Sequence, residues 1–309
     1  MNRHTHSAKR SDVLRASLLT RYPWLVHGFT TRQSGNLSYK VGGASRDDEV
    51  RRNRRGLLRS LLKTQRARAA GLRGGTERFR LVTLRQVHSD IVRVVDASSL
   101  GRGRKPFRAS LQGEPDGAVK LAGDALITAQ PGFLLAVQVA DCLPILLVDP
   151  VRRVVANVHA GWRGTLARIA EKTVGQMRLR FGCEPRRLLA VIGPGIHACC
   201  YEVGPEIFER YLGRFPRAEA LFRRIQPSPT ESHWHPKVIG RPLKPWPTTQ
   251  RPDASIPSGP TEQGTRYFLD LVEANRQQLL SAGLRARNIT ALRFCTACRT
   301  DRFFSHRAE

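Results

Sequence analysis

The stretch FLLAVQVADCLPILLVDPVRRVVANVHAGWRGT, residues 133–165, decides the fold of this chain. Three apolar runs in it have the length and the flanking turn residues of buried strands. The runs are Phe133–Val139, Pro144–Val148 and Val154–Val158. Cys142 lies between two of them and His159 ends the third, so we expect a thiol and an imidazole at the ends of rigid strands. A packed core cysteine and a hydrogen-bonded core histidine would give the same pattern.

Outward from this stretch, helix-like and strand-like segments alternate irregularly, which predicts one mixed α/β domain. Apolar residues at helical spacing predict helices over Leu14–Leu19, Glu49–Leu62, Thr165–Arg180, Pro205–Leu212 and Phe268–Ala282. Short apolar runs predict further strands over Trp24–Thr31, Leu81–Leu84, Ile91–Val95, Ala125–Thr128, Leu188–Ile192 and Ile289–Arg293. We expect residues 1–20 to be disordered or loosely attached and residues 21–309 to form the single domain, with a proline-rich insertion at about 224–265.

The chain is strongly basic, with 52 lysines and arginines against 25 aspartates and glutamates and a formal net charge of +27. The basic residues are spread along the chain without interleaved aromatic residues, which make up 7% of the sequence, so we do not expect nucleic-acid binding. No apolar run approaches the roughly 20 residues of a membrane span, and the N-terminus lacks the apolar segment of a secretion signal. We therefore expect a cytoplasmic protein that does not enter membranes.

Three side chains suited to metal binding lie at predicted strand ends: His88, Cys142 and His159. Their separations of 54 and 17 residues exclude a local zinc-finger loop, so only the fold can assemble them. Three protein ligands with an open fourth position are typical of catalytic zinc. The alternative is a Cys142 nucleophile with a histidine base, and the spacing does not choose between these chemistries. Asp124 and Asp141 are equally well explained as residues that orient a ligand or as turn caps.

Residues 160–164, AGWRG, form a glycine-bracketed turn before a predicted helix. Free backbone N–H groups around Gly161, together with the Arg163 guanidinium, are suited to hold a phosphate. Arg32, in a turn-rich loop, is a second candidate cation. A structural ion pair for Arg163 and an ordinary solvated side chain for Arg32 are the alternatives.

The remaining cysteines give a weaker signal. Cys295 and Cys298 have the CxxC spacing of half a zinc site or of a redox pair, but no second CxxC exists to complete a four-cysteine site. Cys199 and Cys200 follow a Gly-Pro-Gly turn, and we favour a packing role for them over a place in the pocket.

Eight blocks of the sequence resemble, in the same order, the YfiH/LACC1 family, which is also called multicopper polyphenol oxidase or laccase-domain purine nucleoside phosphorylase. The blocks are HGFTTRQSGNLS (27–38), RQVHSDIV (85–92), GDALIT (123–128), VADCLPILLVDP (139–150), NVHAGWRGT (157–165), IGPGIHACCYEVG (192–204), FLDLVEAN (268–275) and CTACRTDRFFSHR (295–307). The resemblance implies a single α/β domain with β-sheets layered between helices, similar to the catalytic domain of the bacterial cytotoxic necrotizing factor. It also implies one zinc ion bound by His88, Cys142 and His159, with copper as the alternative metal.

The resemblance implies that the protein cleaves adenosine, inosine and S-methyl-5′-thioadenosine with phosphate and deaminates adenosine as a side activity. In this interpretation Arg163 and Arg32 bind phosphate and Asn36 binds the ribose or the phosphate, and the other candidate contacts are Asp124, Asp141 and Gly161. Copper-dependent phenol oxidation is the alternative that the family name suggests. The sequence lacks the clustered His-x-His motifs of a multicopper centre, which weighs against it. We expect a monomer or a homodimer.

Overall fold

A computed structural model describes residues 13–38, 44–62, 80–96, 121–226, 237–238, 241–242 and 264–309. The chain divides into two compact units. Unit 1 comprises Met1–Val82, Leu100–Val119 and Pro131–Leu134, and unit 2 comprises Thr83–Ser99, Lys120–Gln130 and Leu135–Glu309. Within the described ranges, no helix is long and apolar enough to cross a membrane.

Unit 1 contains one long helix and several short elements. Its elements are β1 (Val13–Leu14), α1 (Ser17–Thr20), β2 (Phe29–Thr30), the 3₁₀ helix η1 (Arg32–Ser34), α2 (Ala44–Leu62) and β3 (Arg80–Val82), with β6 (Phe133–Leu135) paired to β3. The predicted helix at Glu49–Leu62 is confirmed and begins earlier, at Ala44. Of the strand predicted over Trp24–Thr31, only β2 forms, and it pairs antiparallel with β1.

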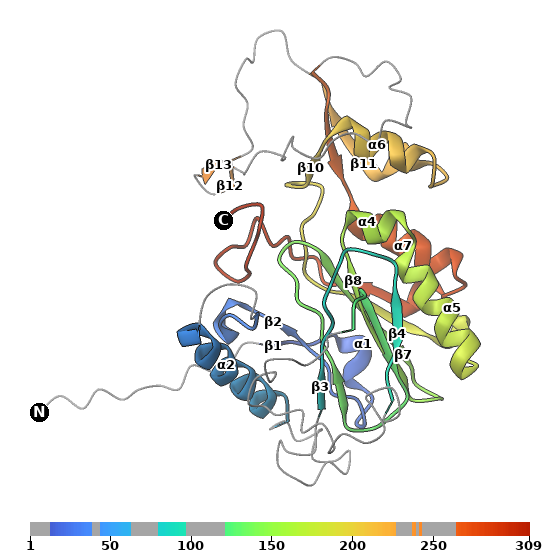
Figure 1. Ribbon diagram of the computed structural model, residues 1–309. Coiled ribbons are helices and arrows are strands. Elements are labelled where there is room, and N and C mark those ends of the chain that lie inside the picture. Colours follow the sequence, from blue (N-terminus) through green and yellow to red (C-terminus); the bar gives the residue numbers. More distant parts are fainter. Residues whose placement is uncertain are drawn as a thin grey trace, which may run out of the picture. The chain divides into compact units, whose positions relative to one another are not determined.

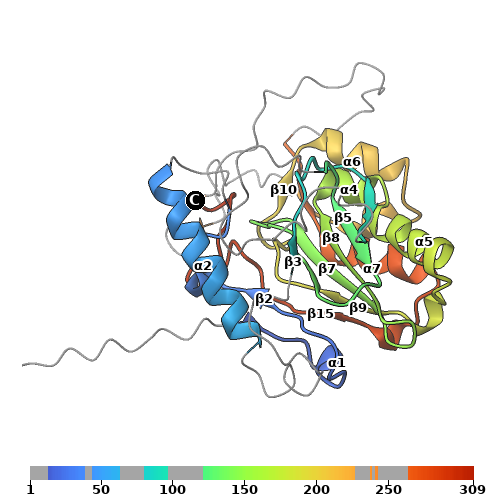
Figure 2. The same cartoon turned by 60° about the horizontal axis from the view of Figure 1, so that its bottom comes forward.

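The centre of unit 2 is a six-stranded mixed sheet in the order β15-β9-β7-β8-β5-β4. Figure 1 labels β4, β7 and β8 of this sheet, and Figure 2 labels β5, β9 and β15. Its strands are β15 (Ile289–Ala291), β9 (Leu189–Ile192), β7 (Leu143–Asp149), β8 (Val154–Ala160), β5 (Ala125–Thr128) and β4 (Val92–Val94). The two longest strands, β7 and β8, come from residues 133–165, and their apolar residues are buried almost throughout. The prediction of a mixed α/β fold is confirmed.

The strand directions gather several chain segments at one edge of this sheet. The pairs β15–β9 and β4–β5 are parallel, whereas β7 runs antiparallel to both β9 and β8, and β8 runs antiparallel to β5. The starts of β4, β5 and β7 therefore lie at the same edge as the ends of β8, β9 and β15. Every candidate metal ligand belongs to a segment that enters or leaves the sheet there.

Helices α4 (Trp162–Leu166), α5 (Ile169–Phe181) and α7 (Leu271–Ser281) lie together beside the sheet, and α5 packs on β8, β5 and β4 (Figures 1 and 2). The predicted apolar face of α5 is buried, with Ile169, Val174 and Met177 among its core residues. Gly182 ends the helix in a left-handed conformation with φ 64°, as its position after the apolar pattern predicted.

The prediction of one continuous helix over Thr165–Arg180 is wrong, because the chain breaks between α4 and α5. Arg168 adopts a left-handed conformation with φ 64° at the break. The Thr165 carbonyl in the last turn of α4 accepts two hydrogen bonds: one from the Arg168 N–H at 2.9 Å and one from Gln278 Nε2 at 2.6 Å. Asn275 Nδ2 donates to the Thr165 hydroxyl at 2.9 Å. Side chains of α7 therefore add hydrogen bonds to the last turn of α4 where the helix stops.

A smaller antiparallel sheet in unit 2 has the order β10-β14-β11, and α6 (Pro205–Leu212) packs against it. Its strands are β10 (Glu202–Val203), β14 (Arg266–Leu269) and β11 (Phe222–Ile225). The start of the helix predicted over Phe268–Ala282 is thus wrong: β14 is a strand, and α7 begins only after it. Asp270 separates the two by accepting a hydrogen bond from the Glu273 N–H at 2.9 Å, which caps α7.

The strand predicted over Phe133–Val139 ends early, at Leu135. Instead of a neighbouring strand, the Gln86 side chain binds this part of the backbone. It donates to the Gln138 carbonyl and accepts from the Gln138 N–H, both at 2.8 Å. One amide side chain thereby satisfies both backbone groups of Gln138.

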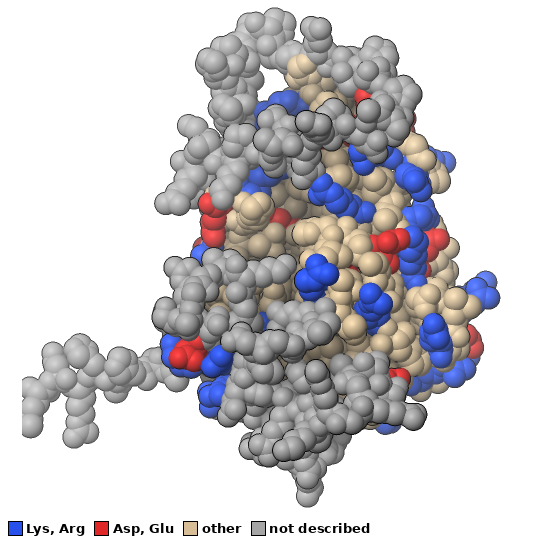
Figure 3. All heavy atoms as spheres, viewed as in Figure 1, with Lys and Arg blue, Asp and Glu red and all other residues tan. Residues whose placement is uncertain are grey.

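The remaining described elements are η3 (Pro185–Arg187), η4 (Ala218–Leu221) and η5 (Ala286–Asn288), with the two-stranded pair β12 (Lys237–Val238) and β13 (Arg241–Pro242). Most of the proline-rich segment predicted at 224–265, and residues 1–12 of the predicted loose N-terminus, lie outside the described residues. Residues 13–20 carry β1 and α1. On the face shown in Figure 3, lysine and arginine side chains are scattered among uncharged and acidic residues. This agrees with the dispersion of the basic residues along the sequence.

Candidate functional site

Three candidate ligands meet at the sheet edge in unit 2. One ligand atom each of His88, Cys142 and His159 lies within 4.8 Å of the others. His159 is buried, Cys142 is half-buried and His88 is exposed, so the cluster opens toward solvent on the His88 side. The rings of His88 and His159 meet edge to face at 5.0 Å between centroids. The structure therefore brings together the three residues that the sequence analysis selected.

The β7–β8 hairpin sets the distance between Cys142 and His159. Its register pairs Leu143 with Ala160, so Cys142 extends the same register opposite Gly161. A Cβ atom built on Gly161 would lie 2.8 Å from the Cys142 sulfur, closer than such contacts allow. Gly161 therefore leaves the space that the thiol occupies, and this close approach rather than backbone freedom explains glycine there.

Asp124 orients His159 through a hydrogen bond to its Nδ1 atom. The Asp124 carboxylate, fully buried, lies with Oδ1 2.9 Å from His159 Nδ1. An ionised carboxylate only accepts hydrogen bonds, so Nδ1 carries a proton and Nε2 is the ring nitrogen that can bind a metal ion. Carboxylates in this position fix the orientation of metal-binding histidines and make them stronger ligands.

The same carboxylate anchors the loop that carries His88. It accepts hydrogen bonds from the backbone N–H groups of His88 at 3.0 Å and Ser89 at 2.6 Å, and from the Ser89 hydroxyl at 2.7 Å. His88 adopts a left-handed backbone conformation, φ 58°, which is unfavourable for a residue with a side chain and requires such support. Asp124 therefore positions both histidines of the cluster.

The charges of the cluster are strongly coupled. Burial alone would raise the pKa of the Cys142 thiol, but hydrogen bonds and charge interactions with His159 and His88 outweigh burial and lower it to about 7. Burial would lower the pKa of His159, but Asp124 and Cys142 raise it to about 9. The pKa of Asp124 lies well below its ordinary range, because the bonds from His159 and Ser89 outweigh its burial. Near neutral pH, Cys142 is therefore readily available as a thiolate.

This coupling predicts the reactivity of metal-free protein toward iodoacetamide. Alkylation of Cys142 should rise with pH around a midpoint near 7, because its pKa is lowered from 9.0 to about 7 and the thiolate is the reactive form. Peptide mapping by mass spectrometry measures the rate at each pH. Cys183, buried and with its pKa raised to about 12, is the internal control and should stay unmodified. A Cys142 midpoint near 9 would contradict the coupling.

Replacing Gly161 by alanine tests the space between the hairpin ends. The added methyl should displace the Cys142 sulfur and weaken zinc binding by about tenfold or more, as changes to the partners of metal ligands do. Competition with a chelator measures the affinity. Gly175→Ala is the matched control, because Gly175 lies in α5 with open space around its Cα; it should stabilise the fold by about 0.5–1 kcal/mol and leave zinc affinity unchanged. Equal zinc affinities of the two variants would contradict the argument.

Asp141, the residue before Cys142, is bonded to the C-terminal segment of the chain. Its carboxylate accepts from the Thr296 hydroxyl and from the Arg307 N–H, both at 2.7 Å, and its carbonyl accepts from the Ile196 N–H at 2.8 Å. Asp141 also has a left-handed backbone conformation, φ 87°. These contacts hold the backbone that leads into Cys142.

Arg163 lies in α4, two residues beyond Gly161. Its guanidinium stacks on the Trp162 ring at 4.2 Å from the ring centroid, and burial lowers its pKa. An arginine held by stacking keeps a fixed direction for its donors, which suits the recognition of a phosphate.

The other two predicted contacts, Arg32 and Asn36, belong to unit 1. Arg32 begins η1, and the Asn36 side chain accepts a hydrogen bond from the Ser38 N–H at 2.9 Å. The Asn36 carbonyl accepts from Asn53 Nδ2 at 2.9 Å. Their roles in substrate binding stay predictions.

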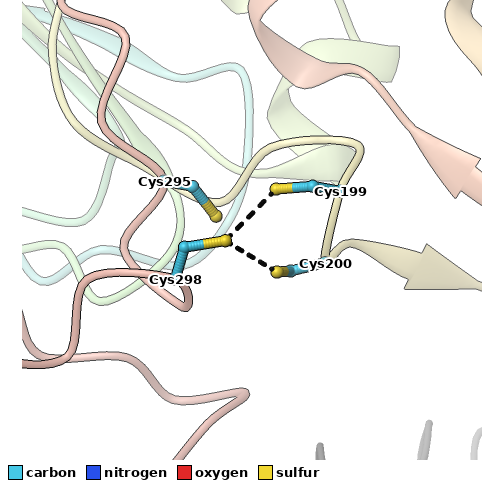
Figure 4. Close-up of side chains that lie close together, drawn as sticks. All are labelled: Cys199, Cys200, Cys295 and Cys298. Atoms are coloured by element: carbon cyan, nitrogen blue, oxygen red, sulfur yellow. Dashed lines mark hydrogen bonds between the residues drawn. The ribbon is translucent and has the colours of Figure 1, made fainter. Parts of the chain in front are cut away.

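Sequence reasoning missed a second cluster of possible metal ligands. The sulfurs of Cys199, Cys200, Cys295 and Cys298 lie within 4.8 Å of one another (Figure 4). The absence of a second CxxC therefore did not prevent a four-cysteine cluster. The adjacent cysteines Cys199 and Cys200 could have indicated the other half of the cluster, but a packing role was favoured for them.

Two chemistries fit the first cluster. The set of two imidazoles and one thiolate suits zinc with an open coordination position, and the Asp124–His159 contact is the support that such sites use. The same thiol and imidazole would also serve as a nucleophile and its base. The arrangement defines a mixed α/β protein with a cluster of two histidines and one cysteine at one edge of its central sheet.

Comparison with known proteins gives the family. The family model described as multi-copper polyphenol oxidoreductase laccase matches residues 26–240 and 245–309. The chain belongs to this family. The crystal structure of YlmD from Geobacillus stearothermophilus is similar, with a TM-score of 0.64 and 30% identity over 93% of this chain and 88% of that chain.

Two relatives are named for enzymes of nucleoside metabolism. Purine nucleoside phosphorylase YlmD from Geobacillus stearothermophilus is 32% identical over 230 residues, covering 74% of this chain and 68% of its own length. Adenosine deaminase RL5, from an unknown prokaryotic organism, is 33% identical over 228 residues, covering 74% of this chain and 69% of its own length. Two more relatives named purine nucleoside phosphorylase are matched over 55% and 66% of their length. The expectation of an enzyme of this kind is confirmed.

Proposed function

We propose that the chain is a zinc-dependent purine nucleoside phosphorylase. It would cleave adenosine, inosine and S-methyl-5′-thioadenosine with phosphate, giving the free base and ribose 1-phosphate or methylthioribose 1-phosphate, and would deaminate adenosine as a side activity. The observation that carries the proposal is the meeting of His88, Cys142 and His159 around one point, in a chain whose relatives are named for these two activities.

The residues at the site fit a zinc ion. Two histidines and a cysteine whose pKa is lowered to about 7 are ordinary zinc ligands, and three of them leave a coordination position open. Zinc bound there would supply a Lewis acid next to the substrate. Asp124 would keep His159 and His88 in place, and Asp141 would hold the backbone before Cys142.

Phosphorolysis requires an anion site beside the nucleoside. A phosphate oxygen attacks C1′ of the ribose, the bond from C1′ to the purine nitrogen breaks, and its electron pair leaves with the purine, which takes up a proton. Arg163, fixed on the Trp162 ring, would bind the phosphate through paired donors. Gly161 would leave the space that the Cys142 thiol needs to reach the ion.

Arg163→Ala should raise the KM for phosphate by about 10- to 100-fold and the KM for adenosine much less, because a charge-assisted hydrogen bond contributes about 1.5–3 kcal/mol. Initial rates over a matrix of phosphate and adenosine concentrations measure both constants. Arg178→Ala, which removes an exposed arginine from the last turn of α5, is the charge-matched control and should change neither. Equal effects of Arg163→Ala on the two KM values would contradict the phosphate role.

The direct test of the proposal is chromatography of adenosine after incubation with zinc-loaded protein, with and without phosphate. Adenine released only when phosphate is present supports phosphorolysis. Inosine formed without phosphate shows deamination as the main reaction and overturns the phosphorylase assignment. Absence of both products overturns both activities and favours the cysteine hydrolase, which a thiol alkylator would block and a chelator would not.

A further inference from the structure

Four cysteines come together from two loops that are far apart in the sequence. One loop follows β9 and carries Cys199 and Cys200; the other follows β15 and carries Cys295 and Cys298. Because β9 and β15 are parallel neighbours, their carboxyl ends meet at the same sheet edge. The loops continue side by side beyond the strands: the Thr296 N–H donates to the Gly195 carbonyl at 3.0 Å, and the Gly195 N–H donates to the Phe294 carbonyl at 3.2 Å.

The four side chains point toward one another, and all are free thiols (Figure 4). The Cys298 sulfur lies 3.5 Å from the Cys199 sulfur and 3.3 Å from the Cys200 sulfur, and every pair in the cluster is within 4.8 Å. Zinc–sulfur bonds of about 2.3 Å at tetrahedral angles place the sulfurs about 3.8 Å apart. The observed spacing therefore matches one tetrahedral ion. An iron–sulfur cluster needs room for several irons and bridging sulfides between the thiolates.

We propose that Cys199, Cys200, Cys295 and Cys298 bind a structural zinc ion, separate from the His88–Cys142–His159 site. Four thiolates fill every position of a tetrahedral ion, so no place is left for a substrate and the site is structural rather than catalytic. Cys200 and Cys295 are buried and Cys298 is half-buried, while Cys199 is exposed and gives the ion a way in from solvent.

Backbone turns make this ligand set possible despite its unusual spacing. The N–H groups of Cys200 and Tyr201 both bond to the His197 carbonyl at 2.9 Å, and this tight turn lets two consecutive cysteines face the same point. On the other loop, the Arg299 N–H bonds to the Cys295 carbonyl at 3.1 Å, which folds the CxxC segment into one turn.

The ion would also stabilise the catalytic edge. Thr296, between Cys295 and Cys298, donates through its hydroxyl to the Asp141 carboxylate at 2.7 Å, and Asp141 directly precedes Cys142. A zinc ion that clamps the two loops would therefore keep the backbone before Cys142 in place. The ion would act by stabilising the folded loops, so its binding does not depend on which reaction the first site catalyses.

Metal analysis of the purified full-length protein, expressed with zinc, tests the proposal. The wild type should carry about two zinc ions per chain, whereas Cys142→Ala and the double variant Cys199→Ser/Cys298→Ser should each carry about one. Cys183→Ser is the matched control, because Cys183 is buried outside both clusters, and should keep both ions. Zinc content of the double variant equal to that of the wild type would overturn the proposal.

Cobalt substitution identifies the ligands even if the double variant folds poorly. In the Cys142→Ala background, added Co²⁺ should give the intense thiolate charge-transfer absorption of a tetrahedral four-sulfur site. In the same background, zinc should protect all four cysteines from alkylation, and chelation should expose them. Iron with acid-labile sulfide, a disulfide within the cluster, or alkylation that is equal with and without zinc would each overturn the proposal. These readouts are separate from turnover, so failure of the proposed phosphorylase activity would leave the zinc inference intact.

Discussion

Replacing Cys142 by alanine is expected to abolish zinc binding at the His88–Cys142–His159 cluster and to lower the rate of phosphorolysis by at least about 100-fold. Changes to residues that merely support metal ligands already cost about 10- to 100-fold, and this change removes a ligand. The fold should survive, since Cys142 is half-buried and its loss removes one sulfur from the edge of the sheet. Zinc content, circular dichroism and adenine release measured on one preparation check all three expectations.

The control for this variant is Cys183→Ala, which removes a buried thiol outside both clusters and should keep zinc and turnover. A cysteine nucleophile would also be lost in Cys142→Ala, so the wild type must be treated with a chelator as well. Zinc removal should inactivate the wild type, and zinc addition should restore it. Full turnover by metal-free wild type would show that the zinc assignment is wrong.

The register of one hairpin explains how far the site follows from the sequence. The turn at VDPVRRV lies midway between Cys142 and His159, and a hairpin centred there pairs Pro144 with His159. The proximity of the thiol and the imidazole is thus contained in the stretch that predicted β7 and β8. His88 is different: its place at a predicted strand end made it a candidate, but it reaches the cluster only because β4 runs parallel to β5, a pairing of distant segments that no local spacing reports.

Features that depend on long-range contacts could not be predicted from local sequence patterns. The left-handed Arg168 that separates α4 from α5 has no glycine to mark it, and the bonds that favour the break come from Asn275 and Gln278 on α7. The four-cysteine cluster depends on the parallel pairing of β9 with β15, which no local spacing reports. Composition and periodicity therefore predicted most of the helices and strands. The contacts between distant segments depend on the order of the strands in the sheet, which local sequence patterns do not give.

The largest effect on stability is expected at Asp124, which also supports two of the candidate metal ligands. This one buried carboxylate accepts hydrogen bonds from the His159 imidazole, from the backbone N–H groups of His88 and Ser89, and from the Ser89 hydroxyl. Asp124→Ala leaves these donors without their acceptor, at about 1–3 kcal/mol for each buried group, so the free energy of unfolding should fall by at least about 3 kcal/mol. Urea denaturation of the metal-free proteins measures the loss.

Asp124→Asn separates the role in positioning from the role in folding. Asparagine keeps the size but not the negative charge, so the His159 pKa should fall from about 9 and its tautomer should no longer be fixed. Zinc affinity should drop about 10- to 100-fold, with part of the turnover regained at saturating zinc, as expected for a residue that acts through a ligand. Ser89→Ala, which removes one of the donors to Asp124, should show a much smaller loss. Wild-type zinc affinity with an unchanged His159 titration, followed by NMR in the metal-free protein, would show that Asp124 does not position the site.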